Sequence, residues 1–185
     1  MHQTEREYRA VIERCQDIFS KKNKDYGPSW RILRLPSITD QIFIKAQRIR
    51  TIQEKGFSKV NEGEVPEFMG IINYCVMALV QIKLAENKNL TLTTTELTAM
   101  YDVEMGEVME LLFSKNHDYA EAWRDMRVSS MTDIILMKLF RIKQIEDNEG
   151  QTIVSEGVQS GYQDIINYAV FCLIKLGYEK ANPNL

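Results

Sequence analysis

The stretch Asp25-Tyr26-Gly27-Pro28-Ser29-Trp30-Arg31 returns 93 positions later as Asp118-Tyr119-Ala120-Glu121-Ala122-Trp123-Arg124. A second block returns after one inserted residue, where Ile71-Ile72-Asn73-Tyr74 matches Ile165-Ile166-Asn167-Tyr168. Self-similarity at a fixed period marks a repeated structural unit and decides the architecture. The sequence therefore predicts a tandem duplication of one unit of roughly ninety residues.

The positions that stayed identical between the copies are mostly polar or aromatic, whereas the apolar positions vary, as at Phe43 and Leu136. A core tolerates apolar exchanges of similar volume, but the geometry of hydrogen bonds and ion pairs does not. The copies therefore appear as two versions of one polar constellation. Common ancestry with little divergence is the alternative explanation for part of the matches.

Composition and charge describe an ordinary globular chain. With 185 residues, 44% hydrophobic and 26% charged, each copy alone would have a marginal core. We therefore expect one shared core, with the first repeat in residues 1–90 and the second in 91–185. The net charge of −3 argues against nucleic acid as a partner, and homo-oligomer formation stays open.

Cysteine use and hydropathy bear on the compartment. Cys15, Cys75 and Cys172 are odd in number and lie in apolar stretches, which is typical of buried thiols in a reducing compartment. The chain begins with polar residues, and no apolar run reaches about eighteen residues. We expect a cytoplasmic protein that does not span a membrane.

Apolar residues recur at helical spacing, and no stretch alternates as a strand would. We expect an all-α fold of two three-helix repeats packed as a pseudo-twofold bundle. Three first-repeat helices are expected at 4–23, 38–55 and 66–86, and second-repeat helices from 95 onward and at 159–180. Thr4 with Glu7 matches a capping box, and Asp25-Tyr26-Gly27-Pro28 is expected to form a turn.

Lys45 and Arg48 lie three residues apart, so they share a helix face, and Lys138 and Arg141 repeat the arrangement. Two like charges beside an apolar stripe are favourable when an anion lies between them. The anion is either a carboxylate of a neighbouring helix, which makes the pair structural, or the phosphate of a substrate. Asp25, Tyr26, Asp118 and Tyr119 lie where a loop is expected, and loops often carry binding residues.

Asp40 and Asp133 each follow a serine by three residues, in Ser37-Ile38-Thr39-Asp40 and Ser130-Met131-Thr132-Asp133. This spacing matches a capping box, and a catalytic role is the alternative. Asn73 and Asn167 lie among apolar residues, where they form either a buried interhelix hydrogen bond or a contact with a polar ligand.

The third helix of each copy carries its acid at a different place. Glu67 stands where the second copy has Gly161, and Asp164 stands where the first has Gly70. Combined, they would give two carboxylates at i and i+3, a set that suits Mg²⁺ with substrate phosphates. Glu62 and Glu156 precede this helix and are further candidate ligands. The alternative is that these acids are solvated groups that stabilise a helix start.

The blocks Lys24-Asp25-Tyr26-Gly27, Lys45-x-x-Arg48 and Ile71-Ile72-Asn73-Tyr74 resemble the nucleotide modification associated domain family, in two copies over nearly the whole chain. The resemblance implies a link to modified or salvaged nucleotides. More distantly, the acidic helix is similar to the MazG-like all-α nucleoside triphosphate pyrophosphohydrolases, whose acidic helices hold Mg²⁺. Gly70 and Gly161 each remove one carboxylate from the paired-acid signature of those enzymes.

Two hypotheses follow for the function. In the first, the chain hydrolyses a modified or ordinary nucleoside triphosphate with Mg²⁺, held by the acids above, while Lys45, Arg48, Lys138 and Arg141 bind phosphates. In the second, it is a non-enzymatic nucleotide-binding or assembly module whose polar network is structural. A small-molecule nucleotide is the expected partner in the first hypothesis and in the binding form of the second.

Overall fold

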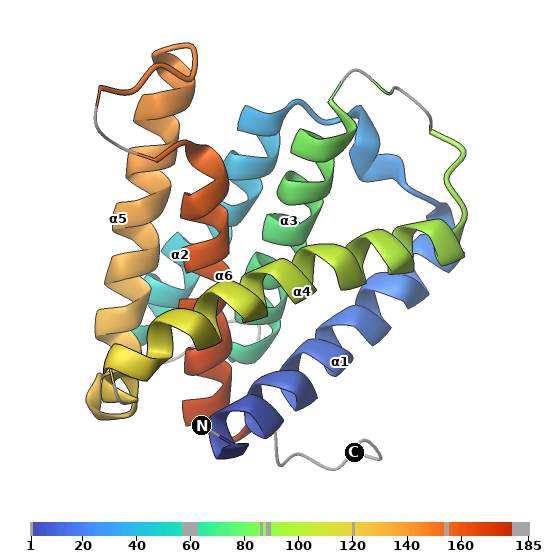
Figure 1. The fold of residues 1–185 in the computed structure, drawn as a ribbon. Coiled ribbons are helices and arrows are strands. Elements are labelled where there is room, and N and C mark those ends of the chain that lie inside the picture. The colour runs from blue at the N-terminus through green and yellow to red at the C-terminus, as the bar shows by residue number, and fades with distance from the viewer. Residues whose placement is uncertain are drawn as a thin grey trace.

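The computed structural model describes residues 2–56, 63–85, 87, 90–119, 121–153 and 156–178. Within these ranges the chain is helical and contains no strand, which confirms the all-α prediction. Each repeat has a long helix, a short 3-10 helix and two further helices (Figure 1). The elements are α1 His2–Tyr26, η1 Ser29–Ile32, α2 Leu35–Lys55, α3 Val65–Leu84, α4 Thr94–Tyr119, η2 Ala122–Asp125, α5 Val128–Asp147 and α6 Val158–Lys175.

The predicted capping boxes are wrong. α1 already begins at His2, so Thr4 lies inside the helix, and its hydroxyl donates a hydrogen bond to Glu121. α2 begins at Leu35 with a proline in its first turn, a position that proline favours, so Ser37 does not cap it. α5 likewise begins before Ser130, after Arg127. The residues that match the capping-box pattern therefore lie inside these helices and not at their N-termini.

A single hydrophobic core takes residues from all six α-helices. α3 packs on α2 and α6, and α5 packs on α2 and α6, while α1 and α4 run obliquely across the others (Figure 1). α3 is the one described helix with the length and mean hydropathy, 1.5, of a membrane span, and 61% of that window is buried in the bundle. Its apolarity is thus that of a central core helix. The division between residues 90 and 91 stays a prediction.

Reciprocal contacts relate the two repeats. The Tyr8 hydroxyl of α1 donates to Asn167 of α6 at 2.8 Å, and the Tyr101 hydroxyl of α4 donates to Asn73 of α3 at 3.0 Å. Tyr8 and Tyr101 are 93 positions apart, so each copy makes the contact that the other makes. Such exchange is what a twofold axis produces. Each repeat therefore lays its first helix on the third helix of the other.

Candidate functional site

Two clefts of nearly equal size lie at equivalent places in the repeats. The N-terminal cleft, about 440 Å³, lies between α1 and α3, and the C-terminal cleft, about 450 Å³, lies between α4 and α6. Equivalent positions line them both, including Asn73 and Asn167, Tyr74 and Tyr168, and Gly70 and Asp164. The duplication therefore produced two candidate ligand sites, which differ in charge where Asp164 stands in place of Gly70.

In the first repeat, Lys45 and Arg48 of α2 share a carboxylate. Lys45 Nζ lies 3.1 Å from one oxygen of Glu67, and Arg48 Nη1 lies 2.7 Å from the other. The Glu67 side chain is only 7% exposed. The prediction that both cations lie within reach of an anion is confirmed, and here the anion is a carboxylate of α3. The Lys-x-x-Arg pair of this repeat therefore forms an interhelix ion-pair network.

In the second repeat, the carboxylate lies one helical turn later. Lys138 Nζ bonds Asp164 at 2.6 Å, and the Asp164 side chain is 46% exposed. Arg141 donates a hydrogen bond to the backbone oxygen of Glu156 at 3.4 Å. Because Gly161 replaces Glu67 at the equivalent position, Arg141 lacks the carboxylate that holds Arg48.

The neighbours of the two glycines explain their positions. A Cβ atom on Gly70 would lie 2.7 Å from Cε of Lys45, so the lysine stem crosses this glycine on its way to Glu67. A Cβ atom on Gly161 would lie 2.8 Å from the side chain of Ile142. The lysine can move because its far end is flexible, whereas Ile142 is buried in the core. Each repeat is therefore packed for its own carboxylate position.

A recess of about 20 Å³ beside the C-terminal cleft brings charges of both signs together. Lys138, Arg141, Glu156 and Asp164 all line it, and the two acids also line the larger cleft. A volume of this size holds about one water-sized group. Within the described residues no three His, Cys, Asp or Glu side chains gather as a metal site. Two carboxylates nevertheless suit Mg²⁺ that is completed by substrate phosphates, so these donors fit the ion.

Among its described residues, the first repeat does not offer the same donors. Glu67 is buried and already bonded to two cations, so it is a poor ligand for a further cation. Glu62, the other acid predicted as a ligand in this repeat, lies outside the described residues. The predicted combination of Glu67 with Asp164 is also not seen, since each bonds the cations of its own repeat.

Aromatic side chains shape the C-terminal cleft. The ring of Trp123 stacks on Phe171 with centroids 4.3 Å apart, and the Arg124 guanidinium lies 4.4 Å from its centroid. Trp123 therefore forms part of the cleft wall, and its ring is already in contact with Phe171 and Arg124. Tyr168 is half-buried and lines the cleft, so it is available to contact a planar ligand.

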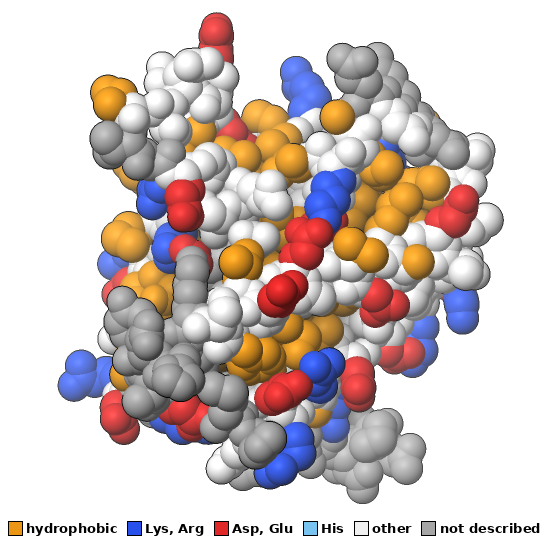
Figure 2. All heavy atoms as spheres, in the orientation of Figure 1, with side chains coloured by type: hydrophobic (Ala, Val, Ile, Leu, Met, Phe, Trp, Pro, Cys, Tyr) orange, Lys and Arg blue, Asp and Glu red, His pale blue; other side chains and the backbone are white. Residues whose placement is uncertain are grey.

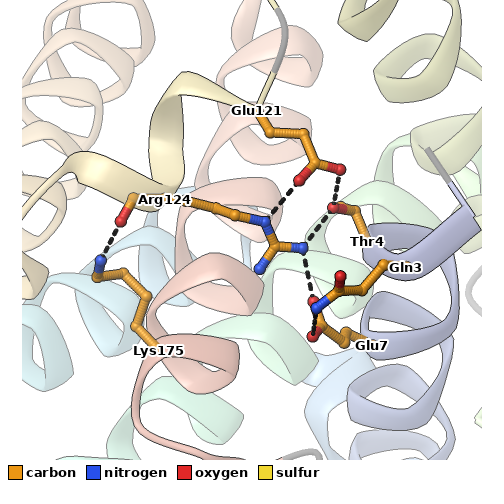
Figure 3. A network of polar contacts seen from close by, with 6 residues as sticks. All are labelled: Gln3, Thr4, Glu7, Glu121, Arg124 and Lys175. Carbon is orange, nitrogen blue, oxygen red and sulfur yellow. Dashed lines mark hydrogen bonds and ion pairs between the residues drawn. The ribbon is translucent and has the colours of Figure 1, made fainter.

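Arg124 fixes η2, which carries Trp123, against the start of α1 (Figure 3). Its guanidinium lies 2.6 Å from Glu121 and 2.7 Å from Glu7, and it donates to the Thr4 hydroxyl. Charge-assisted bonds of this kind hold geometry well. This wall of the C-terminal cleft is therefore held in part by the other repeat.

The two asparagines are engaged in the fold. Asn73 is buried, accepts from Tyr101 and donates to the Cys15 carbonyl at 3.0 Å, which is the interhelix bond that the sequence favoured. Asn167 accepts from Tyr8 but is only half-buried and lines its cleft. Asn167 is thus better placed than Asn73 to spare a polar group for a ligand.

The remaining predicted residues lie elsewhere or outside the description. Asp40 and Asp133 are exposed and bond Lys143 and Arg50 across the repeats, at 2.5 and 3.7 Å, away from both clefts. Tyr26 lines the N-terminal cleft, while Asp25 is exposed in the last turn of α1. The side chains of Asp118 and Tyr119 lie outside the described part. A catalytic role for Asp40 or Asp133 stays a hypothesis, and neither residue lines one of the two clefts.

The sequence analysis missed Lys22, Ser160 and Gln163, which also line the clefts. For Lys22 a signal was present, because Lys22-Asn23 returns 93 positions later as Lys115-Asn116. Extending the repeat upstream of residue 25 would have found it. Ser160 and Gln163 replace Pro66 and Met69, so they carry no repeat signal.

A third hollow is a groove of about 420 Å³ between the end of α3 and the first half of α4, where Figure 2 shows apolar side chains at the surface. Its cation, Lys83, lies 2.9 Å from Glu104 and 2.6 Å from Glu107. Because two carboxylates already surround this cation, the groove is a poor site for phosphate.

The model of the nucleotide modification associated domain 1 family matches residues 22–82 and 115–176, one copy in each repeat. Both clefts lie largely within these two regions. No curated protein and no solved structure matches the chain. The likeness to the MazG-like enzymes stays an interpretation of the sequence.

Proposed function

We propose that this chain, which belongs to the nucleotide modification associated domain 1 family, binds a nucleotide in its C-terminal cleft. One observation carries the proposal: two cations and two carboxylates line a recess at the wall of a cleft of about 450 Å³. Ligand sites are commonly concave and mostly apolar, with a few convergent polar groups. The cleft has this character.

Lys138 and Arg141 supply the phosphate contacts. The guanidinium of arginine matches the geometry of phosphate oxygens in a bidentate way, and lysine adds a point charge. Arg141 is exposed and has Gly161 opposite it in place of a glutamate. An incoming phosphate therefore meets less competition at Arg141 than it would at Arg48, which is bonded to Glu67 at 2.7 Å.

The rest of the cleft suits the base and sugar. Leu111, Leu112 and Phe171 provide apolar wall, and Tyr168 provides an aromatic surface. Ser160 and Gln163 add hydrogen-bonding groups on the α6 side. Binding of the base would thus combine apolar contact with a small number of directional bonds.

Asp164 and Glu156 would hold Mg²⁺ together with the phosphates. When bound, the ion would neutralise phosphate charge and activate water. Asp164 would then exchange its bond to Lys138 for one to the ion, which frees the lysine for a phosphate oxygen. The chain itself orients the ligand and keeps both cations at the same end of the cleft.

Hydrolysis of a nucleoside triphosphate in this cleft is the second candidate function. It is favoured by the presence of two carboxylates beside the cations that would bind phosphate. The non-enzymatic alternative is favoured by the 2.6 Å bond that already neutralises Lys138 and Asp164. The two candidates share one binding site and differ only in turnover.

A calorimetric screen of ordinary and modified nucleoside mono- and triphosphates with Mg²⁺ or Mn²⁺ tests binding, and release of phosphate and pyrophosphate tests hydrolysis. We expect binding to weaken about tenfold or more in Arg141→Ala, because a charge-assisted bond is lost. Gln144→Ala, exposed one turn further along α5, is the matched control.

Absence of binding to any nucleotide, or equal affinity in Arg141→Ala and wild type, would reject the C-terminal cleft as the site. Release of pyrophosphate or phosphate that Asp164→Asn abolishes would establish hydrolysis. Binding without release would leave the non-enzymatic function.

A further inference from the structure

α2 and α5 form one outer layer of the bundle. α1 and α4 pack on α3 and α6, which in turn pack on α2 and α5, so the described helices form three layers of two. Figure 1 shows α2 and α5 on one side of the bundle and α1 on the other. The surface of α2 and α5 that points away from α3 and α6 is the outer face of this layer.

Two ion pairs fix how α2 and α5 lie against each other. Asp40 near the start of α2 lies 2.5 Å from Lys143 near the end of α5. Arg50 near the end of α2 lies 3.7 Å from Asp133 near the start of α5. The helices are therefore antiparallel, with one ion pair at each end of the seam between them. All four side chains are 35% or more exposed, so both pairs lie at the outer face.

Three large apolar side chains are exposed between these ion pairs. Ile44 of α2 is 59% exposed, and Met137 and Phe140 of α5 are 61% and 63% exposed. Ile44 follows Asp40 by four residues, so the two share a face of α2. Met137 follows Asp133 in the same way on α5. Single exposed apolar residues are ordinary, but a group of them with a polar rim marks an interaction site.

The charges on the outer face follow the duplication. Asp40 and Asp133 are equivalent positions of the two repeats, and so are Arg50 and Lys143. Each helix therefore carries its acid near its start and its base near its end. Because the helices are antiparallel, acid and base alternate around the four corners of the face, and the corner charges sum to zero.

This pattern of charge is complementary to itself. When a second copy is turned over about an axis parallel to the seam, its α5 meets α2 of the first copy. Asp40 then faces Lys143 of the second copy, and Arg50 faces Asp133 of that copy. An axis perpendicular to the seam in the same plane also joins opposite charges, because Asp40 then faces Arg50. In both arrangements the apolar side chains meet at the centre.

We propose that the outer face of α2 and α5 is the interface of a symmetric homodimer. Two adjacent helices, together about 20 Å wide and about 30 Å long, present about 600 Å² per copy. Two such faces bury about 1,200 Å², near the lower end of specific interfaces, so we expect a Kd on the order of 1–100 μM. The apolar centre supplies affinity, while the corner charges stay solvated at the rim and fix the orientation.

Sedimentation equilibrium over a range of protein concentrations tests the proposal. Wild type is expected to associate to a dimer. Phe140→Glu is expected to weaken association about tenfold or more, because each copy would bury a charge at the apolar centre. Val103→Glu on α4 is the matched control and should leave association unchanged, since Val103 is also an apolar helix side chain and is 55% exposed.

A second variant tests for a gain, which misfolding does not produce. Gln47 is exposed on α2 and occupies the position equivalent to Phe140. Gln47→Phe copies the side chain of the second repeat into the first, so it enlarges the apolar centre on both copies. We expect association to tighten about tenfold or more, because more apolar surface is buried.

Four results would overturn the proposal. They are wild type that stays monomeric up to about 1 mM, equal association by wild type and Phe140→Glu, no tightening in Gln47→Phe, or association that is lost in Val103→Glu and kept in Phe140→Glu. The first would leave the face to a different partner, and the last would place the interface on α4. Neither Phe140 nor Gln47 lines the C-terminal cleft, so failure here is distinguishable from failure of the function proposed above.

Discussion

Glu67 and Asp164 neutralise equivalent lysines from positions one helical turn apart. Glu67 has a side chain 7% exposed and joins two cations, whereas Asp164 is 46% exposed and joins one. The first arrangement ties α2 to α3, and the second places an acid at the edge of a cleft. A shift of one turn therefore separates a structural ion-pair network from a group that a ligand can reach.

Of the substitutions that test this comparison, the one at Glu67 is expected to change stability most. Glu67→Gln removes the buried charge that Lys45 and Arg48 share, and we expect a loss of about 2–3 kcal/mol in the free energy of unfolding. The matched Asp164→Asn should cost less than about 1 kcal/mol, because its ion pair is partly solvated. Denaturant unfolding of both variants measures the difference. Equal losses in the free energy of unfolding would show that the two acids contribute equally to stability, which would contradict the comparison.

The reciprocal tyrosines should show a smaller asymmetry. Tyr101→Phe leaves the buried Asn73 oxygen without its donor and should cost about 1.5 kcal/mol, whereas water can reach the half-buried Asn167 after Tyr8→Phe, which should cost about 1 kcal/mol or less. Thermal denaturation of both variants checks the order. A larger loss in Tyr8→Phe would contradict the assigned burial.

Glu146 and Gln53 are a further equivalent pair. Glu146 accepts from Thr39 at 2.7 Å and from Tyr162 at 3.1 Å, while Gln53 donates to Thr132 at 3.0 Å. Burial raises the pKa of Glu146 above its unfolded value, so its contribution to stability is complete below the unfolded pKa and is lost as pH rises through the folded pKa.

Glu146→Gln should therefore stabilise the fold at pH 8, by less than about 1 kcal/mol, and give no gain near pH 4, where the glutamate is largely protonated. Thermal midpoints across this pH range test the sign. Glu110→Gln, an exposed acid on α4, is the control and should show no such trend.

The smallest effect is expected at the exposed cross-repeat ion pairs. Asp40→Ala and Asp133→Ala should shift the thermal midpoint by no more than about 2 °C, and by similar amounts, because both pairs are solvated. Nucleotide binding should not change in either variant. Loss of turnover in one of them would restore the catalytic interpretation.

Much of the fold could be predicted because the repeat and the helical periodicity are written into the sequence. The end of α1 was placed too early, since Asp25 and Tyr26 still belong to the helix. Gly27 ends it in a left-handed conformation, φ 68°, with its N–H bonded to the Asn23 carbonyl at 3.0 Å. Gly27-Pro28 signals in the sequence that the helix ends. It does not show whether the last helical turn ends before Asp25 or includes it.

The sequence predicted that the lysine and arginine pairs would lie near an anion. It did not predict which carboxylate each pair would bond. The two positions of the acid, Glu67 or Gly70 in α3 and Gly161 or Asp164 in α6, lie three residues apart on one helix face, so an acid at either position can meet a lysine of the neighbouring helix. Which one does so depends on the packing of Lys45 over Gly70 and of Ile142 against Gly161, and one sequence does not contain those distances. The packing of α1 on α6 and of α4 on α3 could not be predicted either. Tyr8 and Tyr101 fit an ordinary apolar helix face, so the sequence does not show which helix each contacts.

The central claim is the proposal that Asp164 and Glu156 hold Mg²⁺ together with the phosphates of a nucleotide in the C-terminal cleft. Counting Mn²⁺ ions bound per chain by electron paramagnetic resonance, with saturating nucleotide, tests it directly. The account predicts one ion for wild type and none for Asp164→Gly. The same count in wild type and Asp164→Gly would contradict it.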